Sequence, residues 1–312
     1  MARGVAPGKV ILLGEHAVVY GRPALAIPVR QVQAEADVVA GPPGGAPDVH
    51  LIAGDMGRDD WLSRLPDSDP IARITRLTLK ELGLSAATSL EIRVRSSIPI
   101  AGGLGSGAAV SVAVIRAVAD FFGRAIALDR QSALAYEVEQ LHHGNPSGID
   151  NTVVVYDQPV YFRRGEPPHP FPIGSSLHLV IGDSGEAAPT AQAVGRVAAR
   201  LRAQPRETEA LFDRIGDLVE RARPLLEGEA GEPLGNLMNE NQTLLASLGV
   251  STPALERIAS SARSAGAWGA KLSGAGMGGN VIALVAPTSS PGVASAMIAA
   301  GAVRTIQTEV GG

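Results

Sequence analysis

Residues 99–109 read Pro-Ile-Ala-Gly-Gly-Leu-Gly-Ser-Gly-Ala-Ala. Alternating apolar and charged residues over 90–95 predict a half-exposed strand before this segment, and small apolar residues from 106 to about 122 predict a helix after it. Glycines let backbone N–H groups approach an anion closely, and a helix start adds partial positive charge. The segment therefore predicts either a phosphate-binding loop or a Gly/Ala helix packed closely on a neighbour. It has neither the Gly-Lys-Ser/Thr of a Walker loop nor a Gly-x-Ser-x-Gly elbow.

The length and composition narrow the class of protein. The chain has 312 residues, which at about 150 residues per domain favours two domains. With 45% hydrophobic and 19% charged residues it is an ordinary folded protein. A net charge of −4 argues against a nucleic-acid partner, and the absence of cysteine excludes disulfides, zinc-thiolate sites and a cysteine nucleophile.

Membrane and targeting segments are not expected. Lys9 and Glu15 interrupt the N-terminus before an apolar core of signal-peptide length can form. Residues 272–303 carry no charge, but Pro287 and Pro291 break them, so they do not supply a membrane-spanning helix. We therefore expect a cytoplasmic protein without a membrane partner.

Lysine is rare in this chain. Of 27 basic residues, only Lys9, Lys80 and Lys271 are lysines, and two of these stand beside glycine-rich stretches. Lysine is a compact point charge that suits contact with phosphate, and arginine does not replace it freely. Chance is the alternative explanation for three residues.

Periodicity and breakers predict strands and helices in both halves of the chain. Strands are expected at 10–13, 24–29, 32–39, 90–95, 152–156, 177–181, 281–285 and 303–308. Helices are expected at 70–82, 106–122, 129–143, 190–203, 206–227, 233–247 and 252–265. Residues 163–175 are rich in proline and charge and predict a linker. The mixture indicates an α/β or α+β protein of two domains.

Residues 139–151 read Glu-Gln-Leu-His-His-Gly-Asn-Pro-Ser-Gly-Ile-Asp-Asn. Glu139 lies on the expected helix, Gly144 ends it, and Asp150 follows a turn just before the expected strand. Two such carboxylates can flank one cleft, where one holds Mg²⁺ and the other accepts a proton. A capped turn with a solvated aspartate is the alternative. His142 and His143 are a weak metal signal, because adjacent helical residues point apart.

Residues 271–280 read Lys-Leu-Ser-Gly-Ala-Gly-Met-Gly-Gly-Asn. The segment follows an expected helix and precedes a strand, which is the reverse of the order in a dinucleotide-binding fingerprint. Hydride transfer with a nicotinamide cofactor is therefore not expected. A loop against a ligand's phosphate, or a tight turn between packed elements, fits the sequence.

In this order, the segments resemble the GHMP family of small-molecule kinases over nearly the whole chain. The similar stretches are residues 6–21, 103–109, 143–151, 182–190 and 271–280. The resemblance implies an α+β fold with an N-terminal domain like ribosomal protein S5 domain 2 (1–173) and a ferredoxin-like C-terminal domain (174–312). It implies ATP and Mg²⁺ as cofactors, and it allows a homodimer.

The resemblance also implies residue roles. Asp150 would accept the proton of the substrate hydroxyl, Lys9 would stabilise charge on the transferring phosphoryl, and Glu139 and Ser106 would hold Mg²⁺. Residues that would bind the nucleotide are Pro99, Ile100, Ala101, Gly102, Gly103, Leu104, Gly105, Ser106, Gly107, Ala108 and Ala109. Residues that would face the substrate are Glu15, His16, Ser147, Thr190 and Gly276.

Within the family, the opening and catalytic segments are most similar to enzymes that phosphorylate the 5-hydroxyl of mevalonate, so mevalonate is the expected substrate. The alternatives are phosphomevalonate, a sugar or homoserine; a phosphorylated substrate would call on Arg22 or Arg196. A ligand-binding protein without catalysis is a further alternative, favoured by Gly107, where the family usually has a second serine. Asn280 stands where the family often has cysteine, and no chemical role is expected there.

Overall fold

The computed structural model describes residues 1–41, 47–84, 88–99, 102–143, 146–187 and 190–311. The chain forms two compact units, each built from several segments. The first unit contains residues 1–8, 32–99 and 105–157, and the second contains 9–31, 100–104 and 158–312. Strands β1 (Ala2–Leu13) and β2 (Ala24–Ala40) pair with each other and contribute residues to both units. The expected domain boundary after residue 173 stays a prediction.

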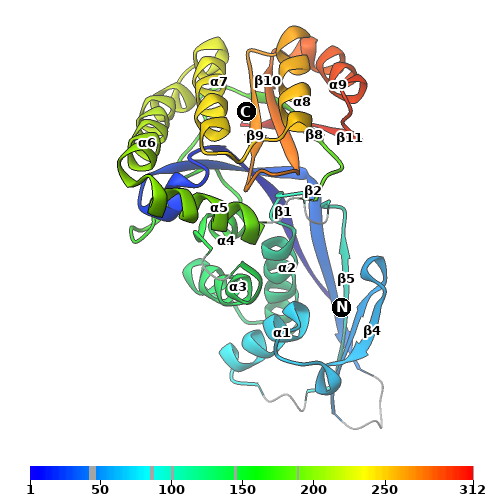
Figure 1. The fold of residues 1–312 in the computed structure, drawn as a ribbon. Coiled ribbons are helices and arrows are strands. Elements are labelled where there is room, and N and C mark those ends of the chain that lie inside the picture. Colours follow the sequence, from blue (N-terminus) through cyan, green and yellow to red (C-terminus); the bar gives the residue numbers. More distant parts are fainter. Residues whose placement is uncertain (42–46, 85–87, 100–101, 144–145, 188–189, 312) are drawn as a thin grey trace. The chain divides into compact units, whose positions relative to one another are not determined.

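The first unit combines strands with a group of helices (Figure 1). Its remaining elements are β3 (Val49–Ala53), β4 (Arg58–Trp61), β5 (Leu90–Ser96), α1 (Pro70–Glu81), α2 (Ser106–Phe121), α3 (Leu128–His143) and α4 (Ile149–Tyr156), with short 3-10 turns at Gly54–Met56 and Leu62–Arg64. Strand β3 runs parallel to β5 and antiparallel to β4, and β5 pairs with the second half of β2. The α+β class expected from the sequence is confirmed.

Helix α2 is the buried centre of the first unit. Residues from Ala108 to Ala119 are almost all inaccessible, and most of them are small. A side chain at Gly4 of β1 would collide with the carbonyl of Ala113. The strand therefore lies directly on the helix backbone, which requires small residues on both sides. Close packing accounts for the alanines that follow the glycine-rich segment.

Residues 149–156 form helix α4, so the strand expected at 152–156 is wrong. Gly148 adopts a left-handed conformation (φ 92°) that starts the helix, and the Thr152 hydroxyl donates to the Gly148 carbonyl at 2.7 Å. Arg116 of α2 donates to the Val155 carbonyl at 2.7 Å near the other end. Packing against α2 and α3 thus overrides the β preference of Thr152 and the three valines. The consequence is that Asp150 lies in the first turn of a helix.

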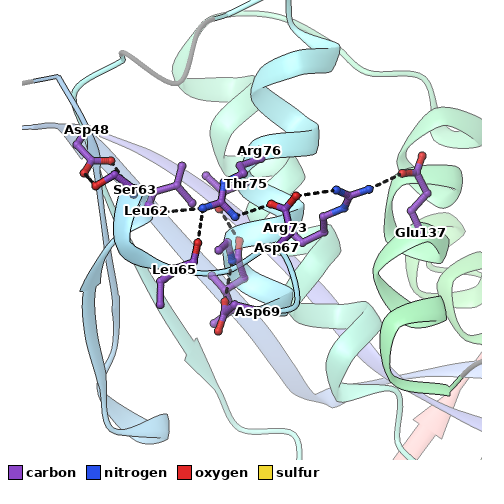
Figure 2. Close-up of polar contacts among 12 residues, drawn as sticks. Asp48, Leu62, Ser63, Leu65, Asp67, Asp69, Arg73, Thr75, Arg76 and Glu137 are labelled. Carbon is purple, nitrogen blue, oxygen red and sulfur yellow. Dashed lines mark hydrogen bonds and ion pairs between the residues drawn. The ribbon is translucent and has the colours of Figure 1, made fainter.

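An arginine on α1 ties the preceding loop to the helix (Figure 2). Arg76 donates to the carbonyls of Leu62 and Leu65, both at 2.6 Å, and to the Asp67 carboxylate at 2.9 Å. The helix itself begins as the sequence predicted, with the Asp69 side chain accepting from the Ala72 N–H at 2.9 Å. Arg76 therefore adds a charged donor to the Leu62 carbonyl, which also accepts from the Leu65 N–H at 3.2 Å, and it supplies a donor to the Leu65 carbonyl.

Arg76→Ala should lower the free energy of unfolding by about 2 kcal/mol, because two loop carbonyls lose a charged donor. Urea unfolding of the purified protein measures this. Arg93→Ala is the matched control, since Arg93 is 58% exposed and pairs with Glu91 on the surface, where a change below about 0.5 kcal/mol is expected. Equal losses in both variants would contradict this role of Arg76.

The second unit contains an antiparallel sheet in the order β11-β8-β10-β9. Its elements are a 3-10 turn (Ala17–Tyr20), β6 (Val160–Phe162), β7 (His169–Pro170), β8 (Leu177–Asp183), α5 (Thr190–Ala203), α6 (Pro205–Glu227), α7 (Gly231–Ser247), α8 (Pro253–Ser264), β9 (Gly269–Ser273), β10 (Asn280–Val285), a 3-10 turn (Pro287–Ser289), α9 (Ser290–Ala299) and β11 (Arg304–Val310). Helices α7, α8 and α9 pack against the sheet strands (Figure 1). No helix in the described ranges is long and apolar enough to cross a membrane.

The glycine-rich segment 274–279 connects β9 to β10, which pair as an antiparallel hairpin. The sequence pattern predicts a helix before this segment and gives no signal for β9. The strand is five residues long and completely buried, with a lysine at its centre, so it shows no polar and apolar alternation. The order strand, glycines, strand agrees with the exclusion of a dinucleotide fingerprint.

Candidate functional site

The start of α2, in the first unit, is the segment predicted to bind phosphate. Gly105 has a left-handed conformation (φ 75°) and precedes the first helical residue, Ser106. The backbone N–H groups of the first turn have no partner within the helix, and the helix dipole adds positive potential there. Gly107 is exposed, and an added Cβ would meet no atom within 4 Å, so packing does not require glycine in place of the serine that the family usually has there. These features fit the predicted phosphate contact of residues 105–109.

Two carboxylates of the first unit lie on adjacent packed helices. Glu139 on α3 is 9% exposed, and Asp150 is half-buried in the first turn of α4. Ser147 precedes α4, and its hydroxyl accepts a weak hydrogen bond from the Ile149 N–H at 3.4 Å. Asn151 is anchored by its Nδ2, which donates to the Ser132 hydroxyl at 2.7 Å. The packing of α3 against α4 places both carboxylates in the same helical layer.

These residues fit a magnesium ion that is bound together with nucleotide phosphates. Mg²⁺ prefers oxygen ligands and usually takes one or two carboxylates plus phosphate and water, without an all-protein cage. No group of three or more acidic, histidine or cysteine side chains in the described ranges could hold a metal. The buried Glu139 carboxylate and the Ser106 hydroxyl are oxygen donors of the required kind.

In the second unit, Lys9 lies on β1 beside the glycine-rich loop. Its backbone N–H donates to the Leu104 carbonyl at 2.9 Å, and the residue is only 2% exposed. The Asn280 side chain donates to the Gly102 carbonyl, and a Cβ at Gly103 would lie 3.4 Å from the Ser273 carbonyl. Residues 102–104 are thus held between β1 and the β9–β10 hairpin. The Asn280 amide therefore makes a structural contact with the backbone of the loop.

Glu15 makes its contacts inside the second unit. The residue is 1% exposed and forms an ion pair with Lys271, while its other oxygen accepts from Asn241 at 3.0 Å. Both carboxylate oxygens therefore have protein partners. The predicted contact of Glu15 with substrate stays a prediction, and the structure gives this side chain a different environment from the one expected.

His16, directly after Glu15, has a positive φ (62°), which is a strained conformation for a residue other than glycine. Its Nε2–H donates to the Ala275 carbonyl at 2.8 Å, which joins the opening segment to the glycine-rich hairpin. Burial lowers the pKa of His16 below its ordinary value of 6.5; the hydrogen bond opposes this shift, and the Lys271 ammonium adds to it. His16 is therefore a neutral hydrogen-bond donor at neutral pH.

The depressed pKa of His16 predicts a pH dependence of stability. The contribution of neutral His16 to the free energy of unfolding is fully present above its unfolded-state pKa near 6.5. That contribution is lost as the pH falls toward the lower folded-state pKa, because the unfolded state binds the proton more readily. We expect the melting temperature to fall between about pH 7 and pH 5 more steeply in the wild type than in His16→Gln. Thermal unfolding at several pH values measures the difference, and parallel curves would contradict the assignment.

The remaining predicted residues lie in both units. Thr190 is the half-buried first residue of α5. Gly276 has φ 75°, and a side chain there would collide with the Val250 carbonyl, so this loop position requires glycine. Pro99 is buried at the end of the β5 segment. Ile100 and Ala101 lie outside the described residues.

Lys271, Asn241 and Ser273 contact the segment that carries Lys9 and Glu15, and the sequence did not predict these contacts. Lys271 is fully buried, and Ser273 exchanges two hydrogen bonds with the Ile11 backbone. The rarity of lysine was the available signal: two of the three lysines are buried here, whereas Lys80 is exposed. Asn241 and Ser273 carry no sequence signal of their own.

Comparisons with known proteins show the family of the chain. The model of the GHMP kinases N terminal domain matches residues 70–158, and the model of the GHMP kinases C terminal domain matches residues 222–303. The mevalonate kinase of Pyrococcus horikoshii is 36% identical, covering 96% of this chain and 93% of its own. The structure of L. major mevalonate kinase with R-mevalonate is similar, with a TM-score of 0.84, 28% identity and coverage of 100% and 96%. The Methanococcus jannaschii mevalonate kinase gives a TM-score of 0.86, 25% identity and coverage of 99% and 98%.

Proposed function

Because the chain belongs to the GHMP kinases, we propose that it transfers the γ-phosphoryl group of ATP to the 5-hydroxyl of mevalonate, forming 5-phosphomevalonate and ADP. The observation that carries the proposal is the 36% identity to a mevalonate kinase over 96% of the chain. The fold agrees, since the structure of a mevalonate kinase with bound R-mevalonate covers the whole chain at a TM-score of 0.84. The candidate residues for phosphoryl transfer are all present in the sequence.

In the proposed reaction, the 5-hydroxyl oxygen bonds to the γ-phosphorus while the bond from that phosphorus to the β-phosphate oxygen breaks. The hydroxyl proton passes to Asp150, and ADP leaves with the bonding electrons. Lys9 stabilises negative charge on the transferring group, and the start of α2 with residues 102–104 binds the phosphates. Such catalysis depends on positioning and charge neutralisation. Mg²⁺ held by Glu139 and Ser106 would neutralise and orient the phosphates.

The environment of two arginines favours an acceptor without its own phosphate. Arg22 donates to Asp213 at 2.8 Å and pairs with Glu209, so two carboxylates already compensate its charge. Arg196 is exposed and donates to the Gly249 carbonyl at 3.1 Å. A phosphorylated substrate would call on one of these two arginines. The compensated charge of Arg22 is the observation that favours mevalonate over phosphomevalonate.

The test is ADP release by the purified protein with Mg-ATP and mevalonate, phosphomevalonate, galactose or homoserine as acceptor. We expect kcat/KM for mevalonate to exceed each other value by at least about 100-fold, because the acceptor site must pair the hydroxyl and carboxylate groups of its own substrate. Good turnover of another acceptor with none of mevalonate would refute the substrate assignment. Absence of turnover with every acceptor would favour a ligand-binding protein. The cytoplasmic location and the homodimer stay predictions.

A further inference from the structure

The segment that carries Lys9 is fastened to the β9–β10 hairpin by side chains. The Ser273 hydroxyl accepts from the Ile11 N–H at 3.0 Å and donates to the Ile11 carbonyl at 3.1 Å. His16 donates to the Ala275 carbonyl five residues further along, and Glu15 pairs with Lys271. Residues 9–16 thus have several fixed points on one strand and its following loop.

The Glu15–Lys271 ion pair is completely buried. Lys271 has no exposed surface, and its ammonium donates to Glu15 and to the Leu272 carbonyl. Asn241 donates to the second oxygen of Glu15, and its own Oδ1 has no partner among the described residues. Burying two charges costs several kcal/mol per ion, and apolar replacements are often neutral or stabilising. Stability alone therefore does not explain the pair.

Helices α7 and α8 hold the backbone on both sides of Lys271. Asn239 accepts from the Ala270 N–H at 3.0 Å and donates to the Trp268 carbonyl at 3.1 Å. Gln242 accepts from the Leu272 N–H at 2.8 Å, and Arg263 donates to the Ala270 carbonyl at 2.9 Å. These side chains form hydrogen bonds with the edge of β9 that faces away from β10, where a neighbouring strand would otherwise pair. The backbone position of Lys271 is consequently fixed.

Lys9 belongs to the same electrostatic cluster. Burial lowers the pKa of the Lys271 ammonium, the Glu15 carboxylate opposes that shift, and the charge of Lys9 adds to it. Lys9 and Glu15 are both buried on the segment 9–16 that is fastened to β9, so two buried ammonium groups and one buried carboxylate lie in the same part of the second unit. Removing Lys271 would leave a buried carboxylate whose remaining partner of opposite charge in this cluster is Lys9.

We propose that Lys271 is a positioning residue for phosphoryl transfer: it neutralises Glu15, so that the ammonium of Lys9 serves the reacting phosphoryl group and not the buried carboxylate. Glu15 then acts through this pair and not by contact with the acceptor. The inference rests on the proposed function, because it assigns the role of Lys271 through Lys9. It explains why a costly buried pair stands beside a lysine of the nucleotide site.

The first test is Lys271→Met alone and combined with Glu15→Gln. We expect the single variant to lower kcat by roughly 100-fold with KM for ATP and mevalonate changed by less than about threefold, since Lys9 is misplaced and binding groups remain. The double variant should recover at least about tenfold of kcat over Lys271→Met, because a neutral amide in place of the Glu15 carboxylate no longer attracts Lys9. An unchanged kcat in Lys271→Met, or a double variant as slow as the single one, would overturn the proposal.

The second test separates positioning from simple destabilisation. In a Lys9→Met background, adding Lys271→Met should leave kcat within about twofold, because the group on which Lys271 acts is already absent. A further loss as large as in the wild-type background would show that Lys271 acts by another route. Far-UV circular dichroism and melting temperatures establish that each variant is folded, and the cycle is run below the lowest melting temperature.

Lys80→Met is the matched control, because it removes the remaining lysine at an exposed position of α1 and should leave kcat unchanged. The wild-type rate with mevalonate separates the two claims. If the wild type phosphorylates a different alcohol, the proposed substrate is wrong, and the same variants are compared with that alcohol. If the wild type phosphorylates mevalonate and Lys271→Met does so equally well, only the inference fails.

Discussion

Asp150→Asn should lower kcat by about 10³-fold, while the Kd for ATP changes by less than about threefold. Asparagine has nearly the same shape as aspartate and keeps one acceptor oxygen, but its neutral amide cannot accept the proton of the substrate hydroxyl. The side chain lies in the first turn of α4, half-buried, so the substitution leaves the helix layer intact. Single-turnover kinetics and nucleotide titration of the same preparation measure the two quantities.

Asp120→Asn is the control for the loss of one acidic group, because Asp120 is exposed near the end of α2. It should retain the wild-type kcat. If Asp150→Asn turns over at a rate close to that of the control, Asp150 does not accept the proton. A loss of ATP binding without a loss of kcat at saturation would assign Asp150 to the nucleotide site.

Lys9→Met is expected to reduce kcat by about 10²-fold or more, with a smaller effect on KM for ATP. The physical reason is that a buried ammonium group stabilises developing charge more strongly than an exposed one, and Lys9 is 2% exposed. Methionine fills a similar volume without the charge. Steady-state kinetics at saturating mevalonate separate the two parameters.

Lys9→Arg tests whether a positive charge alone is sufficient at this position. The guanidinium keeps the charge, but it is larger and planar, and the buried environment beside Leu104 offers it no exposed route. We expect it to rescue less than about tenfold of the lost kcat. A change in ATP affinity alone, in either variant, would contradict a role of Lys9 in the chemical step.

Local signals in the sequence predicted much of the fold. The Asp69-Pro70 start of α1 and the small residues of α2 are reproduced, because capping and composition act within one turn or one helix face. The expected strands at 24–29 and 32–39 are parts of the single strand β2. The local pattern predicts a strand over 152–156, but these β-branched residues are helical because α4 packs against α2 and α3, which a local pattern does not contain.

The candidate site also contains residues that the sequence identifies and contacts that only the structure reveals. Segments with an unusual local composition identified Lys9, Asp150 and the glycine loops, and resemblance supplied their roles. The pairing of Glu15 with Lys271 spans 256 positions of the chain and depends on β1 meeting the β9–β10 hairpin. No local property of either residue predicts that partner, so only the structure reveals that Glu15 is buried and paired.

A crystal structure with mevalonate and a non-hydrolysable ATP analogue tests the central claim most directly. The account predicts that one Asp150 carboxylate oxygen lies within about 3.2 Å of the 5-hydroxyl of mevalonate. It also predicts the Lys9 ammonium within hydrogen-bonding distance of the γ-phosphate, with Lys271 still paired to Glu15. A 5-hydroxyl more than about 6 Å from Asp150 in a complex with both ligands bound would contradict proton transfer to this residue.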